Sequence, residues 1–420
     1  MARPCVRGSP SRTFPIPLSK SDQISRISGF AQRVESDPRF CRDGSQRMDF
    51  MKFKSLATLA SSLLGSKVPI IQGGMGVGIS LAGLAGAVAN QGGIGVISTA
   101  GIGMDEPDFL QNFLEANARA LRKEIRKARE ATRGILGVNI MVAMSNFVDM
   151  VRVAVEEAVD VIFAGAGLPL NLPELLAGSR KTKLVPIVSS GRAARIITRR
   201  WLDRYGRLPD AVVVEGPMAG GHLGFKREQI ADPAFALDRL VPEVMAELRP
   251  FEEAQGRAIP VVPAGGIYTG ADIHKYLEMG AAGVQMATRF VTTDECDASV
   301  DFKRAYLEAK QEDVVIIDSP VGMPGRAIRN QFIDDVGDGK RMPYTCPYHC
   351  LRTCDYQHSP YCIAQALMNA KKGRLKHGFA FVGANAGRER KIIPVRELLE
   401  RLQAEFEAAI RPLVTRGVDA

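Results

Sequence analysis

Eight short apolar runs recur between residues 68 and 290, and each is separated from the next by a stretch long enough for a helix. Their near-continuous Val and Ile content is typical of parallel strands buried on both faces. Eight such units in succession favour a closed barrel over an open, doubly wound sheet. The sequence therefore predicts the α/β class, as a (β/α)8 TIM barrel. The runs are 68–74, 93–99, 135–143, 159–167, 183–190, 210–217, 258–266 and 282–290.

The remainder of the chain divides into two further parts. Residues 1–50 are rich in Arg, Ser and Pro and lack the apolar core of a secretory signal, which predicts a disordered basic extension. We expect residues 51–311 to form the barrel. Residues 312–420 combine an irregular Gly-, Pro- and Cys-rich stretch with a final helix that carries i,i+4 charge pairs. This last part is predicted to be a cap or flap packed on the barrel.

The formal net charge of +9 raises the question of a nucleic-acid partner. Residues 1–47 hold nine Lys or Arg and four Asp or Glu, which is +5, so the remaining chain carries only +4. No basic stripe with interleaved aromatic residues follows, and we expect no nucleic acid as a partner. The long apolar stretches are broken by glycines, so we expect no membrane span either. Seven cysteines without a secretory signal favour a reducing, cytoplasmic compartment.

Glycine clusters follow several of the predicted strands. QGGMGVG (72–78) ends the first, and its glycines would let the backbone approach a ligand closely, although a tight turn explains them equally well. AGGI (264–267) follows the seventh strand and MATRF (286–290) the eighth. Barrels of this type commonly hold a phosphate on these two loops. Gly265, Gly266 and Thr288 therefore predict a phosphate-bearing cofactor, against the alternative of two ordinary turns.

One histidine stands out among the five in the chain. EGPMAGGHLG (215–224) follows the sixth strand and would present His222 at the mouth of the barrel, whereas the other histidines fall in a helix or in the irregular tail. A histidine near its usual pKa can take a proton from carbon or hold an anion at neutral pH. We expect His222 to be the catalytic residue, with a plain packing role as the alternative.

The motifs QGGM, GVNIM, GAG, VEGPMAGGHLG, PAGGI and MATRF, in this order, resemble the nitronate monooxygenase (2-nitropropane dioxygenase) family. They resemble nearly as well its close relative, the FMN-dependent enoyl-acyl-carrier-protein reductases. The resemblance spans about residues 65 to 330. It implies an FMN-binding barrel with His222 as the catalytic histidine. The cofactor-binding residues that it implies are Gln72, Gly73, Gly74, Met75, Asn139, Gly221, Gly265, Gly266, Gln285, Ala287 and Thr288.

Two positions depart from the family pattern. The family usually reads E-A-G-G-H and G-T-R-F, whereas this chain has Met218-Ala219 before the Gly-Gly-His and Ala287 before Thr288. Met218 removes a carboxylate near the histidine, which affects the histidine pKa or the polarity of the substrate. The extra methyl group of Ala287 is a smaller change. Both bear more on the identity of the substrate than on that of the cofactor.

Four cysteines crowd into 17 residues with the spacing C-x3-C-x3-C-x7-C: Cys346, Cys350, Cys354 and Cys362. Four thiolates so close together can bind a [4Fe-4S] cluster or zinc, although the spacing matches neither the usual zinc ribbon nor the ferredoxin run. On a helix the first three would share one face, so three buried free thiols are the alternative. Because the segment follows the barrel, we expect a structural or electron-relay role.

The leading functional hypothesis is oxidation of a small alkyl nitronate by FMN and O2, with His222 holding or abstracting the α-proton. The alternative within the same class is reduction of an enoyl thioester by NAD(P)H through FMN. A third hypothesis is a non-catalytic barrel that binds a nucleotide or phosphate. The expected partners are thus small molecules, and the sequence leaves open whether the chain forms a homo-oligomer.

Overall fold

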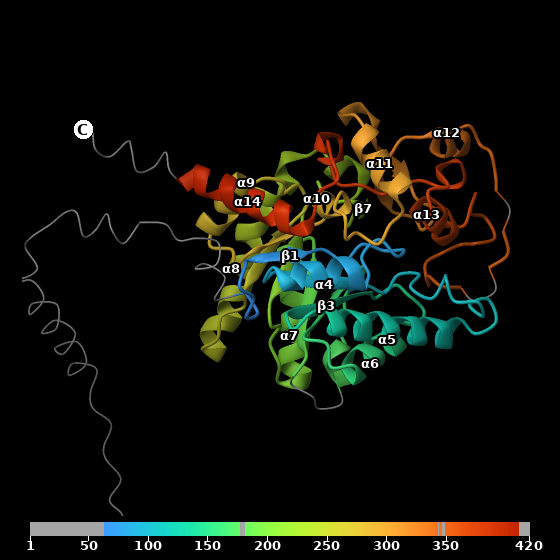
Figure 1. Cartoon of the computed structure of the whole chain (residues 1–420). Helices are drawn as coiled ribbons and strands as arrows, with labels where there is room; N and C mark the ends of the chain where they lie inside the picture. Colours follow the sequence, from blue (N-terminus) through green and yellow to red (C-terminus); the bar gives the residue numbers. More distant parts are fainter. Residues whose placement is uncertain (1–62, 177–180, 343, 347–348, 411–420) are drawn as a thin grey trace, which may run out of the picture. The chain divides into compact units, whose positions relative to one another are not determined.

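The structure is a computed structural model, and it describes residues 63–176, 181–342, 344–346 and 349–410. Eight parallel strands close into a barrel in the order β1-β2-β3-β4-β5-β6-β8-β9 (Figure 1). Each strand lies inside one of the eight apolar runs, so the predicted (β/α)8 barrel is confirmed. The barrel strands are β1 (Ile70–Gln72), β2 (Ile94–Ser98), β3 (Ile135–Met141), β4 (Val161–Gly165), β5 (Lys183–Val188), β6 (Val212–Glu215), β8 (Val261–Ala264) and β9 (Val284–Met286). The predicted basic extension, residues 1–50, lies outside the described residues.

Helices follow the strands around the outside of the barrel, with one exception. Between β4 and β5 the described residues form a short 3-10 helix, Leu172–Leu176, instead of an α-helix. Pro169 and Pro173 lie in this connection and lack the N–H groups that an α-helix needs. The helices of the barrel are α4 (Ala82–Asn90), α5 (Phe113–Ala131), α6 (Phe147–Glu156), α7 (Gly191–Tyr205), α8 (Leu237–Gln255), α9 (Gly270–Glu278) and the short α10 (Thr288–Val291).

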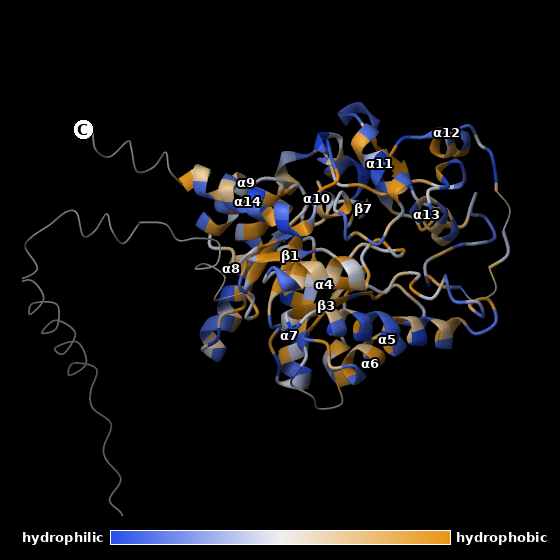
Figure 2. Ribbon diagram, viewed as in Figure 1, coloured by the Kyte–Doolittle hydropathy of each residue, from blue (hydrophilic) through white to orange (hydrophobic). Residues whose placement is uncertain are grey.

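The apolar side chains form two layers on either side of the strands. Inside the barrel, Ile71, Val96, Phe163 and Val213 belong to one buried cluster. Outside it, a larger cluster joins the strands to the inward faces of the helices and contains the fully buried Trp201 of α7. Figure 2 shows apolar colour on β1 and β3 and mixed colour along α5, as expected of a helix with one buried face.

The chain beyond the barrel adds a second sheet and four helices. The sheet has the order β10-β11-β7, in which the hairpin of β10 (Val314–Asp318) and β11 (Pro324–Ile328) pairs with the two-residue β7 (Gly221–His222). The helices are α11 (Val300–Glu308), α12 (Gln331–Gly337), α13 (Ile363–Lys371) and α14 (Val395–Ile410). Helix α14 packs along α9, and the two lie side by side in Figure 1.

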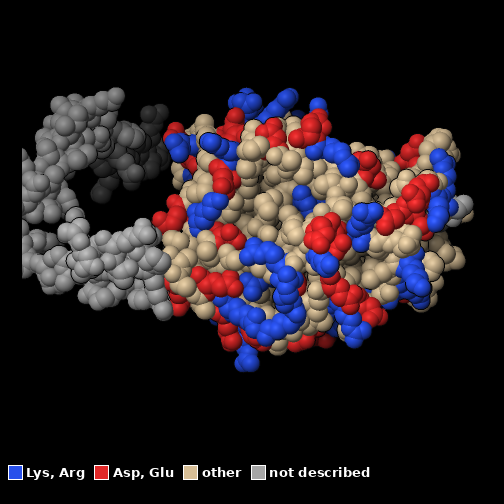
Figure 3. All heavy atoms as spheres, turned by 90° about the horizontal axis from the view of Figure 1, so that it is seen from above, with Lys and Arg blue, Asp and Glu red and all other residues tan. Residues whose placement is uncertain are grey.

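Basic and acidic side chains are interspersed over the face drawn in Figure 3. Many of them pair on the surface, as Arg126 does with Glu157 at 2.6 Å and Lys275 with Asp238 at 2.5 Å. In the part of the chain that the structure describes, no helix combines the length and the apolar character needed to cross a membrane.

Candidate active site

Polar side chains converge on the inside of the barrel at the carboxyl ends of the strands. Paired residues of neighbouring strands point to the same face of a sheet, and side chains alternate along each strand. Ala264, which belongs to the inner cluster, pairs with both Glu215 and Gln285. Ser98 pairs with Asn139, and each lies two residues beyond an inward position of its strand. These four side chains therefore line the mouth of the barrel, where active sites of this fold are built.

The glycines after β1 leave room for two of these side chains. A Cβ on Gly74 would lie 2.4 Å from the Cβ of Asn139, and a Cβ on Gly73 would lie 3.3 Å from the Cγ of Gln285. Neighbouring Met75 is partly buried against the core. Gln72 is fully buried, and its amide bonds to the main chain of Gly73 and of Val96. Gln72 thus shapes the first loop of the mouth, and its side chain does not face the opening.

The loops after β8 and β9 begin with residues in backbone conformations that favour glycine or open a helix. Gly265 and Gly266 have φ values of +89° and +91°, which side chains rarely adopt. Ala287 stands at the N-cap of α10 and Thr288 at its first residue, so free N–H groups begin there. The predicted phosphate-binding positions Gly265, Gly266 and Thr288 directly follow β8 and β9, which are adjacent strands of the closed barrel.

A segment of the C-terminal part covers these loops. Asn385 donates a hydrogen bond from Nδ2 to the carbonyl of Gly266 at 2.8 Å, and the N–H of Ala384 donates to the carbonyl of Met218 at 3.1 Å. A Cβ on Gly383 would lie 2.5 Å from the Oγ1 of Thr288. Residues 383–385 were not among the predicted site residues, although the glycine and asparagine of GANAG are a signal for close backbone packing.

His222 stands on β7 at the mouth and is held from two sides. Its Nε2 lies 2.7 Å from the Oγ of Ser319, in the turn between β10 and β11. Its ring meets that of Phe381 edge to face, with 4.9 Å between centroids. Burial lowers the pKa of His222 to about 4, so its imidazole is neutral near pH 7. A fixed, neutral imidazole can accept a proton from carbon.

Arg326 fixes the loop that carries the histidine. It lies on β11 and pairs in register with Gly221, which has a φ of +73°. Its Nη1 donates hydrogen bonds to the carbonyls of Pro217, at 2.8 Å, and of Ala219. Arg326 is only 7% exposed, and burial lowers the pKa of its guanidinium to about 10. The backbone before His222 is therefore anchored to the second sheet.

A cleft of about 430 Å³ opens beside this loop. Its apolar wall includes Ile230, Leu237 and Met218, which is 46% exposed. Gly266 and Arg388 line the same cleft. Met218, which stands where the family pattern has a carboxylate, thus faces an open space that continues from the predicted phosphate loop.

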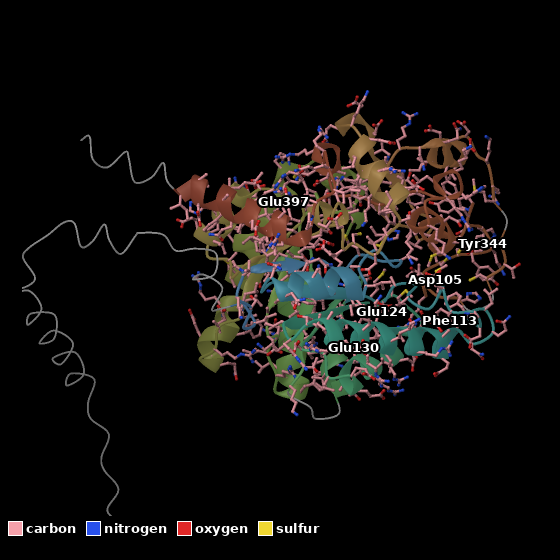
Figure 4. All side chains as sticks on the ribbon, in the orientation of Figure 1. Asp105, Phe113, Glu124, Glu130, Tyr344 and Glu397 are labelled. Carbon is pink, nitrogen blue, oxygen red and sulfur yellow. The ribbon has the colours of Figure 1, made fainter. Side chains whose placement is uncertain are left out.

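The four clustered cysteines lie in a segment of turns and bends, so the interpretation of three thiols on one helical face was wrong. Hydrogen bonds to the loop after β3 hold the described part of this segment: Ser145 donates its N–H to the carbonyl of Cys350 at 3.1 Å, and Arg352 donates its N–H to that of Ala143 at 3.0 Å. Tyr344, close to the first cysteine in the sequence, is labelled in Figure 4.

These cysteines are free thiols and all are partly buried. Burial, together with the nearby thiols of Cys362, Cys346 and Cys354, raises the pKa of Cys350 to about 12. In the described ranges, no group of three or more His, Cys, Asp or Glu side chains is arranged to hold a metal ion. The predictions of a [4Fe-4S] cluster or zinc therefore gain no support from a ready-made ligand set.

The chain resembles several known proteins over most of its length. A family model described as nitronate monooxygenase matches residues 57–405. The chain is 31% identical over 287 residues to the (3aS,4S,5R,7aS)-5-hydroxy-7a-methyl-1-oxo-octahydro-1H-indene-4-carboxyl-CoA dehydrogenase of Mycobacterium tuberculosis, which covers 68% of this chain and 70% of that protein. It is 28% identical over 309 residues to a protein of Staphylococcus saprophyticus named "Probable nitronate monooxygenase", with 67% and 81% covered.

Solved structures share the fold. FabK from Thermotoga maritima superimposes with a TM-score of 0.66 at 29% identity, and the match covers 85% of this chain and 98% of that one. Nitroalkane oxidase from Streptomyces ansochromogenes superimposes with a TM-score of 0.63 at 23% identity, and the match covers 83% and 99%.

Proposed function

The chain belongs to the nitronate monooxygenase family, whose members are flavin-dependent oxidoreductases, and we propose that it oxidises small alkyl nitronates with FMN and O2. The observation that carries this proposal is the neutral, doubly held His222 at a barrel mouth whose adjacent loops form a glycine cradle. The family assignment also sets aside the hypothesis of a non-catalytic barrel.

The residues of the mouth fit an FMN molecule. Gly265, Gly266, Ala287 and Thr288 would hold its phosphate through backbone N–H groups. Position 265 has to be glycine for this loop to keep its path, because a Cβ there would meet the backbone of Gly216 and Ala219 at 2.9 Å. Bound FMN would supply the two-electron chemistry, taking electrons from the substrate anion and returning them to O2.

The histidine provides the proton chemistry. When a nitroalkane is the substrate, His222 accepts the α-proton as the C–H bond breaks, and the electron pair stays on the substrate as the nitronate anion. The Ser319 hydroxyl orients the ring through Nε2. The imidazolium that this proton transfer creates would then hold the negative charge of the nitronate formed beside it.

This protonation state predicts the acid limb of the pH profile. Because burial lowers the pKa of His222 from 6.5 to about 4, kcat/KM should stay level down to about pH 5 and fall only as the pH approaches 4. The unfolded chain binds this proton already below about 6.5, so the same shift makes the free energy of unfolding fall between pH 6.5 and 4. A limb at the ordinary histidine value, in a steady-state profile with a nitroalkane, would contradict a buried neutral base.

A glycine substitution tests the phosphate loop. Gly265→Ala places a side chain at a φ of +89° and against the backbone of residues 216 and 219, so the dissociation constant for FMN should rise about tenfold or more. Gly256→Ala is the matched control, because Gly256 also has a positive φ, +60°, but a Cβ there meets nothing within 4 Å. Fluorescence titration with FMN measures both. Equal affinities in the two variants would place the phosphate elsewhere.

A second candidate function is reduction of an enoyl thioester by NAD(P)H. The cleft beside Met218 favours it, since its apolar side chains could pack against an extended acyl chain while Lys275 and Arg388 at the same cleft offer positive charge. The similar protein of Mycobacterium tuberculosis is named as a dehydrogenase of a carboxyl-CoA compound, which is a thioester. Anaerobic mixing separates the candidates: bleaching of the flavin by a nitronate alone supports oxidation, and rapid bleaching by NAD(P)H supports the reductase.

We also propose that the four clustered cysteines hold an iron–sulfur cluster in the assembled enzyme. The Tyr344 hydroxyl interacts with the side chains of Ser359 and Cys354, so polar groups gather beside the clustered thiols. Electrostatic effects of Cys354 and Cys362 reach Tyr344. Each thiolate of a [4Fe-4S] cluster binds a different iron, so the sulfurs need not converge on one point as around zinc.

Iron and acid-labile sulfide analysis of protein purified without oxygen tests this cluster. About four of each per chain are expected. Cys354→Ser should lose iron, whereas Cys296→Ser, which changes a buried thiol of the main core, should keep it. Iron-free wild-type protein would contradict the proposal. For the wider setting we propose the cytoplasm, where thiols stay reduced, and a cap role for residues 312–420 above the barrel of residues 51–311.

A further inference from the structure

Glu215 is a carboxyl group of the barrel mouth that the proposed reaction does not use. It ends β6, and Val213, two residues earlier, belongs to the inner cluster of the barrel. Its partner in the sheet is Ala264, another inner residue. Because side chains alternate along a strand, Glu215 points into the barrel at its carboxyl end. Its side chain is partly exposed there, so the mouth gives access to it.

The side chains at the same level of the mouth are uncharged. They are Ser98 of β2, Asn139 of β3 and Gln285 of β9. Among the residues that the structure describes, none donates a hydrogen bond to the Glu215 carboxyl. A carboxylate in this position lacks both a counter-ion and a donor, which makes its charged form costly. The surrounding barrel removes part of the solvent from this carboxyl, and this desolvation raises the pKa of Glu215 to about 7.

The charged and titratable groups on the elements around β6 do not neutralise Glu215. Lys183 of β5 faces the barrel interior, but its Nζ bonds to the carbonyl of Leu64 at the opposite end. His222 of β7 is neutral. Arg326 of β11 is bonded to backbone carbonyls of the loop. On the outer face of β6, α8 turns Leu240 and its other buried apolar residues toward the strands.

We propose that Glu215 is the proton acceptor that accompanies reduction of the flavin. This inference rests on the proposed FMN site. Reduction of FMN to its anionic reduced form consumes two electrons and one proton. The negative charge of the reduced flavin disfavours the negative charge of the Glu215 carboxylate, because both lie in the low-dielectric mouth. The carboxylate therefore takes up one further proton and forms an O–H bond. The electrons come from the substrate, and the proton comes from water at the mouth.

A group of this kind has a physical reason to remain in the barrel. An apolar residue at the end of β6 would avoid the cost of burying a carboxyl without a partner. A carboxyl that changes its charge near neutral pH can instead compensate a charge that appears and disappears in each catalytic cycle. Glu215 would thereby make reduction easier at low pH and return its proton when O2 reoxidises the flavin.

The test compares the reduction potential of FMN-loaded wild-type protein with that of Glu215→Gln at several pH values from about 5.5 to 8.5, which bracket neutrality. At pH values above the pKa of Glu215, the reduction potential of the wild type should depend more steeply on pH than that of Glu215→Gln. The difference in slope should correspond to one additional proton taken up for each flavin that is reduced. Glu253→Gln, which changes an exposed glutamate of α8, should behave like the wild type. The same pH dependence in wild type and Glu215→Gln would overturn the assignment.

A second measurement needs no variant. The infrared difference spectrum of wild-type protein, reduced minus oxidised with dithionite at about pH 8, should gain the C=O band of a newly protonated carboxyl group. Absence of that band would also overturn the role of Glu215. Wild-type protein that binds no FMN would instead reject the proposed function itself, so the two failures are distinguishable.

Discussion

His222→Ala is expected to slow turnover by about 10²- to 10⁴-fold while the protein keeps its FMN. The variant removes the only imidazole that the structure places on β7, and with it the acceptor for the α-proton of the substrate. The loops proposed to bind phosphate lie after β8 and β9, so the dissociation constant for FMN should change little. Anaerobic stopped-flow with a nitroalkane measures the loss, because the slow step is then proton transfer from carbon.

The control for this experiment is His358→Ala. His358 is exposed and pairs with Asp355 at 2.8 Å within the cysteine-rich segment. The turnover of the His358→Ala variant should equal that of the wild type. If His222→Ala were equally active with a nitroalkane, the mouth of the barrel would need another base. Activity that is lost with the nitroalkane but retained with the preformed nitronate would show that His222 acts chiefly in proton abstraction.

Arg326→Met should lower the free energy of unfolding by about 2 to 5 kcal/mol. Methionine keeps the apolar stem but removes the donor from two buried carbonyls, and each unpaired carbonyl costs about 1 to 3 kcal/mol. These carbonyls, of Pro217 and Ala219, lie just before His222. Turnover should therefore fall together with stability, because the loop is free to turn the imidazole away from Ser319. Urea unfolding of the flavin-free protein gives the energy.

Arg329→Met is the matched control for this variant. Arg329 lies three residues further along the chain, its side chain is 61% exposed, and it pairs with Asp334 at 2.8 Å. An exposed pair of this kind contributes less than about 1 kcal/mol. An equal, small loss of stability in both variants would mean that water can replace the Arg326 guanidinium.

The barrel could be predicted from the sequence because its signal is local. Each strand is a short run of Val and Ile, and each run predicts a strand without reference to the rest of the chain. In the second sheet only β10, with the sequence VVIID, carries such a signal. β7 consists of Gly221 and His222 alone, and its partner β11 lies about a hundred residues later. A two-residue strand has no periodicity, so only tertiary contact reveals it.

The candidate site divides in the same way. His222 and the glycine loops belong to recognisable motifs, and the sequence predicted them as a group. Ser319 and Arg326 lie in a hairpin without a motif, and their roles depend on contacts that no spacing encodes. Glu215 is the first residue of the motif EGPMAGGHLG. Because side chains alternate along a strand, its position two residues after Val213 would have predicted a side chain that points into the barrel. The predicted residues at the mouth remain untested as ligands of FMN.

The pairing of β7 with β11 has a consequence for synthesis of the protein. When the eighth barrel strand has left the ribosome, the nascent chain already contains the glycines of the loops after β1 and β8. The hairpin that seats the imidazole is made only afterwards. The contacts that fix His222 are therefore made after the barrel strands. A product that terminates before the β10–β11 hairpin would contain all eight barrel strands but would lack the contacts that hold the imidazole.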